Sequence, residues 1–170
     1  MQGEKKQEAP EEAVVRLLKE QGLTVTTAES CTGGLIAGTL VNVAGASDVL
    51  GEAYVTYSNE AKQRLVGVLS GTLEQYGAVS AQTAREMASG AAKAAGADVG
   101  LSSTGIAGPG GGTEEKPVGL VYIGCSVRGE VQVRELHFHG TRMENRLHTV
   151  EEAFRLAAEM LYGSCPPDYP

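Results

Sequence analysis

The sequence lacks tryptophan altogether, and aromatic residues of any kind make up only 5% of its 170 residues. Proteins that bind single-stranded nucleic acid use aromatic side chains as stacking platforms, so this composition disfavours that class. Basic residues are also few: 14 lysines and arginines against 21 acidic residues give a net charge of −7. Because proteins that bind nucleic acid or anionic membranes are usually basic, we expect neither nucleic acid nor a membrane as a partner.

Cysteine is scarce, and Cys31, Cys125 and Cys165 lie far apart in the chain. They form neither a C-x-x-C pair nor a zinc-binding spacing, so no metal site is predicted. Residues 1–12 are mostly polar or charged and do not resemble a signal peptide. No apolar run reaches the ~20 residues that span a bilayer. We therefore expect a cytoplasmic protein with reduced thiols.

Glycine, in contrast, is abundant, with 23 residues set between alternating helical and strand patterns. Strands are predicted over residues 23–28, 52–57, 99–104, 118–127 and 131–139. Helices are predicted over residues 10–21, 32–43 and 59–66, from Ser80 to about Ala95, and from Thr141 onward, with a loop-like segment over 67–79. Early alternation followed by a hairpin predicts an α/β fold, a three-layer α/β/α sandwich with a mixed sheet. We expect one domain over residues 9–162, a flexible lead-in over 1–8, and an extended or disordered tail over 163–170.

The stretch AESCTGG, residues 28–34, places a hydroxyl and a thiol at a predicted strand-to-helix turn. Ligands of α/β proteins bind beyond the carboxyl ends of strands, where Ser30 would lie. The free N–H groups of Cys31, Thr32, Gly33 and Gly34 would then be available to stabilise an oxyanion. Two alternatives stay open. Ser30 fits an ordinary helix N-cap, and Cys31 fits either a rival nucleophile or a buried small side chain.

A second stretch, TYSNEAK at residues 56–62, supplies a candidate base. If its strand neighbours the first strand, Tyr57 and Lys62 converge on Ser30. A lysine near a helix N-terminus, and partly buried, has a lowered pKa and can accept the proton of a serine hydroxyl. An ordinary surface lysine and a half-buried tyrosine would fit the same pattern. The three histidines lie late in the chain, at spacings that support neither a Ser–His pair nor zinc.

Arg142 and Arg146 are spaced i, i+4 in the first turns of the last predicted helix. Cations at this end oppose the helix dipole, and a bound phosphate or carboxylate would remove the conflict. Salt bridges with Glu135 and Glu144 are the alternative. The glycine-rich stretch TGIAGPGGGT, residues 104–113, either wraps a ligand with its N–H groups or is a flexible link, and it matches neither common nucleotide-binding motif.

Four stretches together resemble the CinA family: TTAESCTGG (26–34), GEAYVTYSNEAKQRLVGV (51–68), STGIAGPGGGTEEKPVGLVYIG (103–124) and GTRMENRL (140–147). The resemblance is to the stand-alone C-terminal domain of these competence/damage-inducible proteins, and it covers about residues 10–162. It implies an α/β sandwich and a nicotinamide-nucleotide amidase activity. In that reaction nicotinamide mononucleotide (NMN) is deamidated to nicotinic acid mononucleotide and ammonia, a step in pyridine nucleotide recycling. The resemblance implies that Ser30, Tyr57 and Lys62 are the catalytic residues.

The chemistry of NMN deamidation suggests roles for further residues. Ser30 would attack the amide carbon while Lys62 removes its proton with help from Tyr57. Arg142 and Arg146 would bind the phosphate of NMN. The ring or ribose would be lined by Thr104, Gly105, Ala107 and Gly108. No cofactor or metal is needed, and the expected partners are NMN and a second copy of the chain in a homodimer. Two alternatives remain: a nucleotide-binding or scaffold module without turnover, and a Ser–Lys amidase for another phosphorylated amide.

Overall fold

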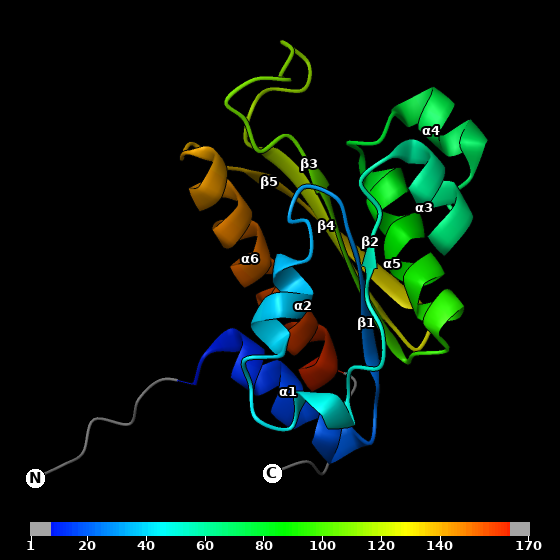
Figure 1. Cartoon of the computed structure of the whole chain (residues 1–170), viewed down its shortest axis with the longest axis vertical. Coiled ribbons are helices and arrows are strands. Elements are labelled where there is room, and N and C mark those ends of the chain that lie inside the picture. Colours follow the sequence, from blue (N-terminus) through cyan, green and yellow to red (C-terminus); the bar gives the residue numbers. More distant parts are fainter. Residues whose placement is uncertain (1–7, 164–170) are drawn as a thin grey trace, which may run out of the picture.

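The computed structural model describes residues 8–163 of the chain. A single sheet runs through the molecule, with α1, α2 and α6 on one face and α3, α4 and α5 on the other (Figure 1). This arrangement confirms the predicted three-layer α/β/α sandwich. Most of the predicted lead-in and tail, residues 1–7 and 164–170, lies outside the described residues. Glu8 forms an ion pair with Arg16, and Gly163 is the last residue of α6.

The sheet has five strands in the order β2-β1-β3-β4-β5. Their bounds are β1 Val25–Glu29, β2 Tyr54–Val55, β3 Val99–Gly105, β4 Leu120–Val127 and β5 Glu130–His137. The first three strands in that order are parallel, and β4 and β5 add an antiparallel hairpin, so the sheet is mixed as predicted. The carboxyl ends of β1, β2 and β3 therefore meet at one edge. The strand predicted over residues 52–57 is shorter, because only Tyr54 and Val55 pair with β1.

The helices are α1 Pro10–Gln21, α2 Leu35–Leu40, α3 Asn59–Val66, α4 Ser70–Tyr76, α5 Ala81–Ala95 and α6 Arg142–Gly163, with a short 3-10 turn at Ala46–Asp48. Predicted boundaries of α1, α3 and α5 are confirmed, and their local sequence signals explain why. Pro10 begins α1, and the hydroxyls of Ser58 and Ser80 accept main-chain N–H groups at the starts of α3 and α5. In the part of the chain that the structure describes, no helix is long and apolar enough to cross a membrane.

Two predictions about helices are wrong. The helix expected over residues 32–43 begins only at Leu35, because Gly33 and Gly34 adopt left-handed backbone angles, with φ of 59° and 102°. The segment over 67–79, expected to be loop-like with at most one helical turn, contains the seven-residue helix α4. The Glu86 carboxylate stabilises the start of α4 by accepting the Leu69 N–H, a contact between elements that local sequence does not announce.

Small residues let α5 lie very close to the sheet and to α3. A Cβ atom on Gly100 of β3 would lie 2.1 Å from the Ala88 carbonyl oxygen of α5, and one on Gly90 would lie 1.8 Å from the Val66 oxygen of α3. Only glycine permits these approaches. Because α5 packs closely on both β3 and α3, α3 lies near the carboxyl edge of the sheet, where the candidate site is.

The larger hydrophobic core fills the other face, between the sheet and the helices α1, α2 and α6. Its most deeply buried large side chains include Leu17, Ile36 and Phe154. At the start of α6, Glu144 Oε2 accepts the Thr141 N–H at 2.7 Å, and the Thr141 hydroxyl accepts the Glu144 N–H at 3.4 Å, which is a capping box. The cap fixes the end of α6 that faces the candidate site.

Candidate active site

Ser30 follows β1 directly, at the edge where the carboxyl ends of the three parallel strands meet. Its N–H donates to the Ser103 carbonyl of β3 at 2.9 Å, which fixes its backbone against the sheet. The residue is partly buried, and its hydroxyl lies on the side of the sheet that α3 covers, since it contacts Lys62 of that helix. This is the position at which α/β proteins bind their ligands.

The structure brings Lys62 to Ser30. Lys62 Nζ lies 3.2 Å from the Ser30 hydroxyl oxygen, 2.9 Å from the Thr56 carbonyl and 3.4 Å from the Tyr57 carbonyl. The side chain is only 1% exposed, and no carboxylate within residues 8–163 forms an ion pair with it. The surface lysine that the sequence left open is therefore excluded.

Burial lowers the pKa of Lys62, because the charged ammonium loses its water without gaining an anionic partner. The contacts are compatible with the neutral amine that a base requires. A neutral amine has two N–H donors and one lone pair, and two carbonyls plus one hydroxyl surround Nζ. With both donors directed at the carbonyls, the lone pair faces the Ser30 hydroxyl. This is the arrangement of a general base and its nucleophile.

Cys31, the rival nucleophile, is buried and 5% exposed. Burial raises the pKa of its thiol to about 11, so the thiolate is scarce at neutral pH. Of the two candidate nucleophiles in this turn, only Ser30 contacts a base.

The turn is built around Glu29, a residue to which the sequence reasoning gave no role. Its carboxylate is fully buried and accepts five hydrogen bonds. The donors are the hydroxyls of Thr27 and Thr32 and the N–H groups of Gly34, Ile36 and Ala37. The interpretation of Ser30 as the helix cap is thus wrong: Gly34 occupies the N-cap position and the Glu29 carboxylate takes the N–H groups. The sequence did contain a signal for a structural role of Glu29: a charged residue directly follows a run, rich in β-branched residues, that is expected to be a buried strand.

These contacts reduce the number of N–H groups that are available to an oxyanion. Gly34 donates to Glu29, and the Gly33 N–H donates to the Ser30 carbonyl at 3.1 Å, so neither is free as predicted. Within residues 8–163, the N–H groups of Cys31 and Thr32 donate to no other residue. These two N–H groups, adjacent to Ser30 in sequence, are the ones left for a substrate oxygen.

Arg146 holds the same turn from α6. Its Nε donates to the Cys31 carbonyl at 3.0 Å and its Nη2 to the Thr32 carbonyl at 3.0 Å. Much of the guanidinium is therefore engaged by the protein main chain. The alternative in which Glu144 pairs with this arginine is not found, because Glu144 accepts from Thr141 instead.

Arg142 bridges two elements at the mouth of the site. Its Nη1 donates to the Gly108 carbonyl at 2.8 Å and its Nη2 to the Tyr57 hydroxyl at 3.2 Å. The salt bridge considered for it with Glu135 is also absent from the described residues, since Glu135 contacts Tyr122 and His137. Tyr57 is 62% exposed, and its hydroxyl contacts Arg142, whereas only its carbonyl reaches Lys62.

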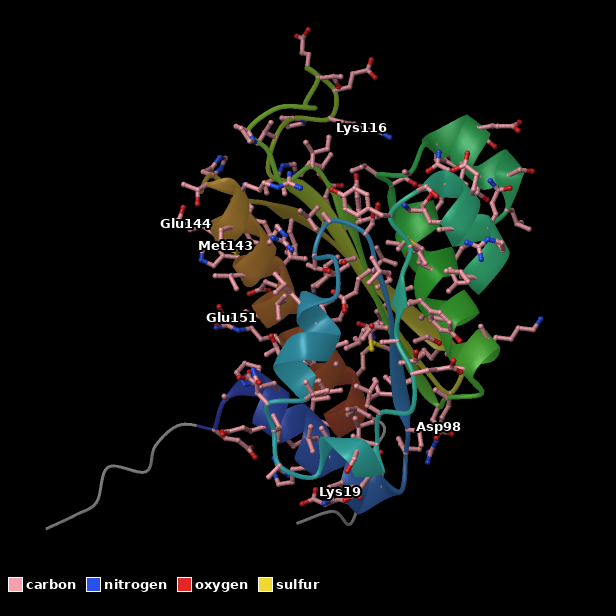
Figure 2. All side chains as sticks on the ribbon, in the orientation of Figure 1. Lys19, Asp98, Lys116, Met143, Glu144 and Glu151 are labelled. Carbon is pink, nitrogen blue, oxygen red and sulfur yellow. The ribbon has the colours of Figure 1, made fainter. Side chains whose placement is uncertain are left out.

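The glycine-rich loop is tied to its surroundings at several points. Thr104 is buried and donates its hydroxyl to the Ala78 carbonyl at 2.7 Å, and the Ala107 carbonyl accepts from Asn145 at 3.0 Å. Gly105 has no room for a side chain, because a Cβ atom there would lie 2.6 Å from Val121. Figure 2 shows Lys116 extending from the loop toward α4, where its Nζ donates to the Tyr76 carbonyl at 2.6 Å. These contacts tie the two ends of the loop, and residues 109–115 between them are exposed.

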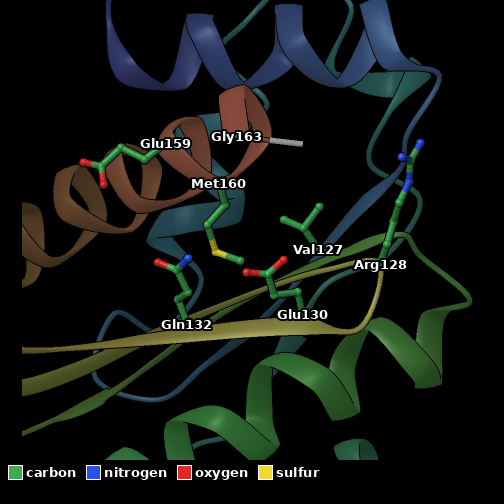
Figure 3. A pocket seen from close by; sticks show the side chains of 7 residues that line it. All are labelled: Val127, Arg128, Glu130, Gln132, Glu159, Met160 and Gly163. Atoms are coloured by element: carbon green, nitrogen blue, oxygen red, sulfur yellow. The ribbon is translucent and has the colours of Figure 1, made fainter. Parts of the chain in front are cut away.

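A cavity of about 440 Å³ lies elsewhere, between the β4–β5 turn and the end of α6 (Figure 3). It is lined by Val127, Arg128, Glu130, Gln132, Glu159, Met160 and Gly163. Because Val127 pairs with Val99, the first residue of β3, the cavity lies at the opposite end of the sheet from Ser30. Among residues 8–163, no group of three His, Cys, Asp or Glu side chains is placed to hold a metal.

The fold and the site together define a class of protein: an α/β sandwich in which a parallel strand ends at a serine paired with a buried lysine. The family model of the CinA C-terminal domain matches residues 7–161, so the chain belongs to the CinA family. The resemblance seen in the sequence is thereby confirmed.

Two curated relatives show how close the likeness is. A CinA-like protein from Kosmotoga olearia is 59% identical over 140 residues, which are 82% of this chain and 34% of that protein. A competence-damage inducible protein from Clostridium novyi is 56% identical over 143 residues, 84% of this chain and 34% of that protein. The chain thus spans about a third of the length of these relatives.

Solved structures agree with the fold. The competence/damage inducible protein CihA from Agrobacterium tumefaciens is 46% identical, with a TM-score of 0.84 over 90% of this chain and 95% of that chain. A CinA superfamily protein from Klebsiella pneumoniae is 34% identical, with a TM-score of 0.87 over 91% and 96%.

Proposed function

We propose that this protein is an amidohydrolase that deamidates NMN to nicotinic acid mononucleotide and ammonia. The observation that carries the proposal is the contact between Ser30 and a buried lysine that has no carboxylate partner among residues 8–163. A lysine in this setting is a base for a serine hydroxyl, and such a pair forms and hydrolyses acyl-enzymes. The CinA family resemblance directs this chemistry to a nucleotide carboxamide.

In the first half of the reaction, the Ser30 oxygen attacks the carboxamide carbon and its proton passes to Lys62 Nζ. The N–H groups of Cys31 and Thr32 stabilise the oxyanion that forms on the carbonyl oxygen. Protonated Lys62 then gives its proton to the departing nitrogen. The C–N bond breaks, ammonia leaves, and an ester joins Ser30 to the nucleotide.

In the second half, a water molecule attacks the ester carbon and gives its proton to Lys62. The proton returns to the Ser30 oxygen as the C–O bond breaks, and the carboxylic acid product leaves and gives its remaining proton to solvent, which yields the carboxylate. Hydrolysis of an amide through these groups requires no redox cofactor, because the only changes are two acyl transfers and their proton movements.

Arg142 is the residue that this proposal assigns to the phosphate. It lies at the exposed start of α6, and its present partners are a main-chain carbonyl and the Tyr57 hydroxyl rather than an anion. Exchange of these neutral acceptors for a phosphate would give charge-assisted hydrogen bonds. Tyr57 holds Arg142 in place before the phosphate binds, and its carbonyl accepts from Lys62 throughout.

Ammonia release from NMN tests this function. The same enzyme is offered amides without the phosphate, and phosphorylated amides without the pyridine ring. Release from NMN and not from the others supports the proposal, whereas preference for another phosphorylated amide would identify a related Ser–Lys amidase. NMN binding measured by calorimetry, with no ammonia at any pH from 6 to about 10, would indicate a nucleotide-binding module without turnover.

A further inference from the structure

Glu29 does for α2 what Ser30 would otherwise do. The N–H groups at the start of a helix need acceptors, and a serine hydroxyl placed before the helix is a common one. Here the Glu29 carboxylate accepts from Gly34, Ile36 and Ala37 at 2.9–3.0 Å. The Ser30 hydroxyl is thereby left to Lys62.

Thr32 is held at both of its ends. Its hydroxyl donates to Glu29 at 2.6 Å and pairs with the Ser103 hydroxyl of β3, also at 2.6 Å. Its carbonyl and that of Cys31 accept from Arg146. The C=O of Cys31 and the N–H of Thr32 belong to one planar trans peptide and point in opposite directions. By holding that carbonyl, Arg146 turns the Thr32 N–H away from α6.

We infer that Glu29 is a positioning residue for the Ser30 reaction: its carboxylate caps α2 in place of Ser30 and fixes Thr32, so that the hydroxyl faces Lys62 and the Thr32 N–H stays free for the substrate oxygen. This inference rests on the proposed function in so far as Ser30 is the nucleophile. Glu29 itself touches neither substrate nor Lys62. Its effect therefore has to appear in the rate of acylation rather than in substrate binding.

A matched control exists on the other face of the sheet. Glu86 accepts the Leu69 N–H at 2.9 Å and the Thr72 hydroxyl at 2.6 Å, so it caps α4 much as Glu29 caps α2. Glu29→Gln and Glu86→Gln make the same chemical change at two helix starts. If both carboxylates only stabilise a helix start, both variants lose stability and neither loses kcat. If Glu29 also positions the Ser30 turn, only Glu29→Gln loses kcat.

The experiment compares kcat and KM for NMN, and the thermal midpoint, in the wild type and these two variants. We expect Glu29→Gln to lower kcat by about 10²-fold, the scale of losing one oxyanion donor, with KM changed less than about twofold. The acid limb of the pH profile should not move, because Lys62 keeps its surroundings. Glu86→Gln should lower the thermal midpoint and leave kcat unchanged. An unaltered kcat in folded Glu29→Gln would overturn the inference.

If Glu29→Gln does not fold, Thr32→Val takes its place, since it removes only the hydroxyl that joins Glu29 to the turn. A wild-type kcat in Thr32→Val would then overturn the inference. Labelling of Ser30 by a fluorophosphonate, measured as a rate by mass spectrometry, separates the inference from the choice of substrate. If the wild type is labelled but releases no ammonia from NMN, the proposed function fails, and slower labelling of Glu29→Gln still supports positioning. Absence of labelling in the wild type would overturn the inference as well.

Discussion

Replacement of Lys62 by methionine is the most informative single change in this protein. Methionine has a similar length, fills the same buried space and cannot accept a proton. General base catalysis contributes about 10²- to 10⁴-fold to such reactions, so we expect Lys62→Met to lower kcat for NMN by at least about 10²-fold. Lys93→Met, a change at an exposed lysine on α5, is the matched control and should leave kcat unchanged.

The pH dependence of the wild type follows from the lowered pKa of Lys62. Only the neutral amine accepts a proton, so kcat should rise with pH and level off above the Lys62 pKa in the substrate complex. Because the pKa is lowered, the midpoint of this rise lies below the ordinary lysine value of 10.5. Below it, kcat should fall tenfold for each pH unit, the slope of a single ionisation.

Stability should show the same ionisation with a definite sign. In the unfolded chain Lys62 keeps its proton up to about pH 10.4, whereas the folded protein releases it at a lower pH. Between these two pKa values the unfolded state binds more protons, so the free energy of unfolding rises with pH. Each difference of one between the two pKa values contributes about 1.4 kcal/mol. Lys62→Met should lack this rise, while losing about 1 kcal/mol for each of the two carbonyls that it leaves without a donor.

Two assays complete the test: ammonia release at saturating NMN from pH 6 to about 10, and urea unfolding over the same range. The difference in unfolding free energy between wild type and Lys62→Met should increase with pH toward about 10.4 and be flat at the acid end. A wild-type kcat that is flat over the whole range, or a Lys62→Met variant with wild-type activity, would refute the assignment of Lys62 as the base.

Three other changes probe separate parts of the account. Cys31→Ala should keep kcat within about threefold, because the thiol is buried and its pKa is about 11. The lost packing should cost about 1 kcal/mol of stability. An inactive but folded variant would show that the thiol is essential. Arg142→Ala should raise KM for NMN by about tenfold or more with a smaller effect on kcat, as expected for one charge-assisted contact to phosphate, and an unchanged KM would remove Arg142 from the phosphate site. Ser80→Ala should lower the free energy of unfolding by about 1 kcal/mol in urea titrations, because it removes the cap of α5, and kcat should be unaffected; equal stability would contradict the capping contact.

The parts of the fold that were predictable carry their signal in neighbouring residues. Pro10 with its two following glutamates begins α1, and Ser58 and Ser80 begin α3 and α5. The parts that were not predictable depend on side chains from other elements. Both α2 and α4 start at carboxylates, Glu29 and Glu86, that reach across from a strand or another helix. No pattern of local propensity contains such contacts.

The candidate site also has parts that the sequence predicts and parts that it does not. The meeting of Ser30 and Lys62 follows from placing two strands side by side, a pairing that the sequence analysis stated only as a condition and that the structure shows. The direction of the Tyr57 hydroxyl was not expected, although alternation along an extended chain gives a reason: Thr56 is buried, so the next side chain points outward. The contact of Arg146 with the turn joins residues that are 115 positions apart, and only the folded chain reveals it.

Ammonia release by Ser30→Ala, measured beside the wild type, shows whether the Ser30 hydroxyl is the nucleophile. The variant is first shown to be folded and to bind NMN, so that a loss of activity reports on chemistry alone. We expect the wild type to release ammonia from NMN and Ser30→Ala to release none above the uncatalysed rate. Ammonia released by Ser30→Ala at the wild-type rate would contradict the account, because the hydroxyl beside Lys62 would then not be the nucleophile.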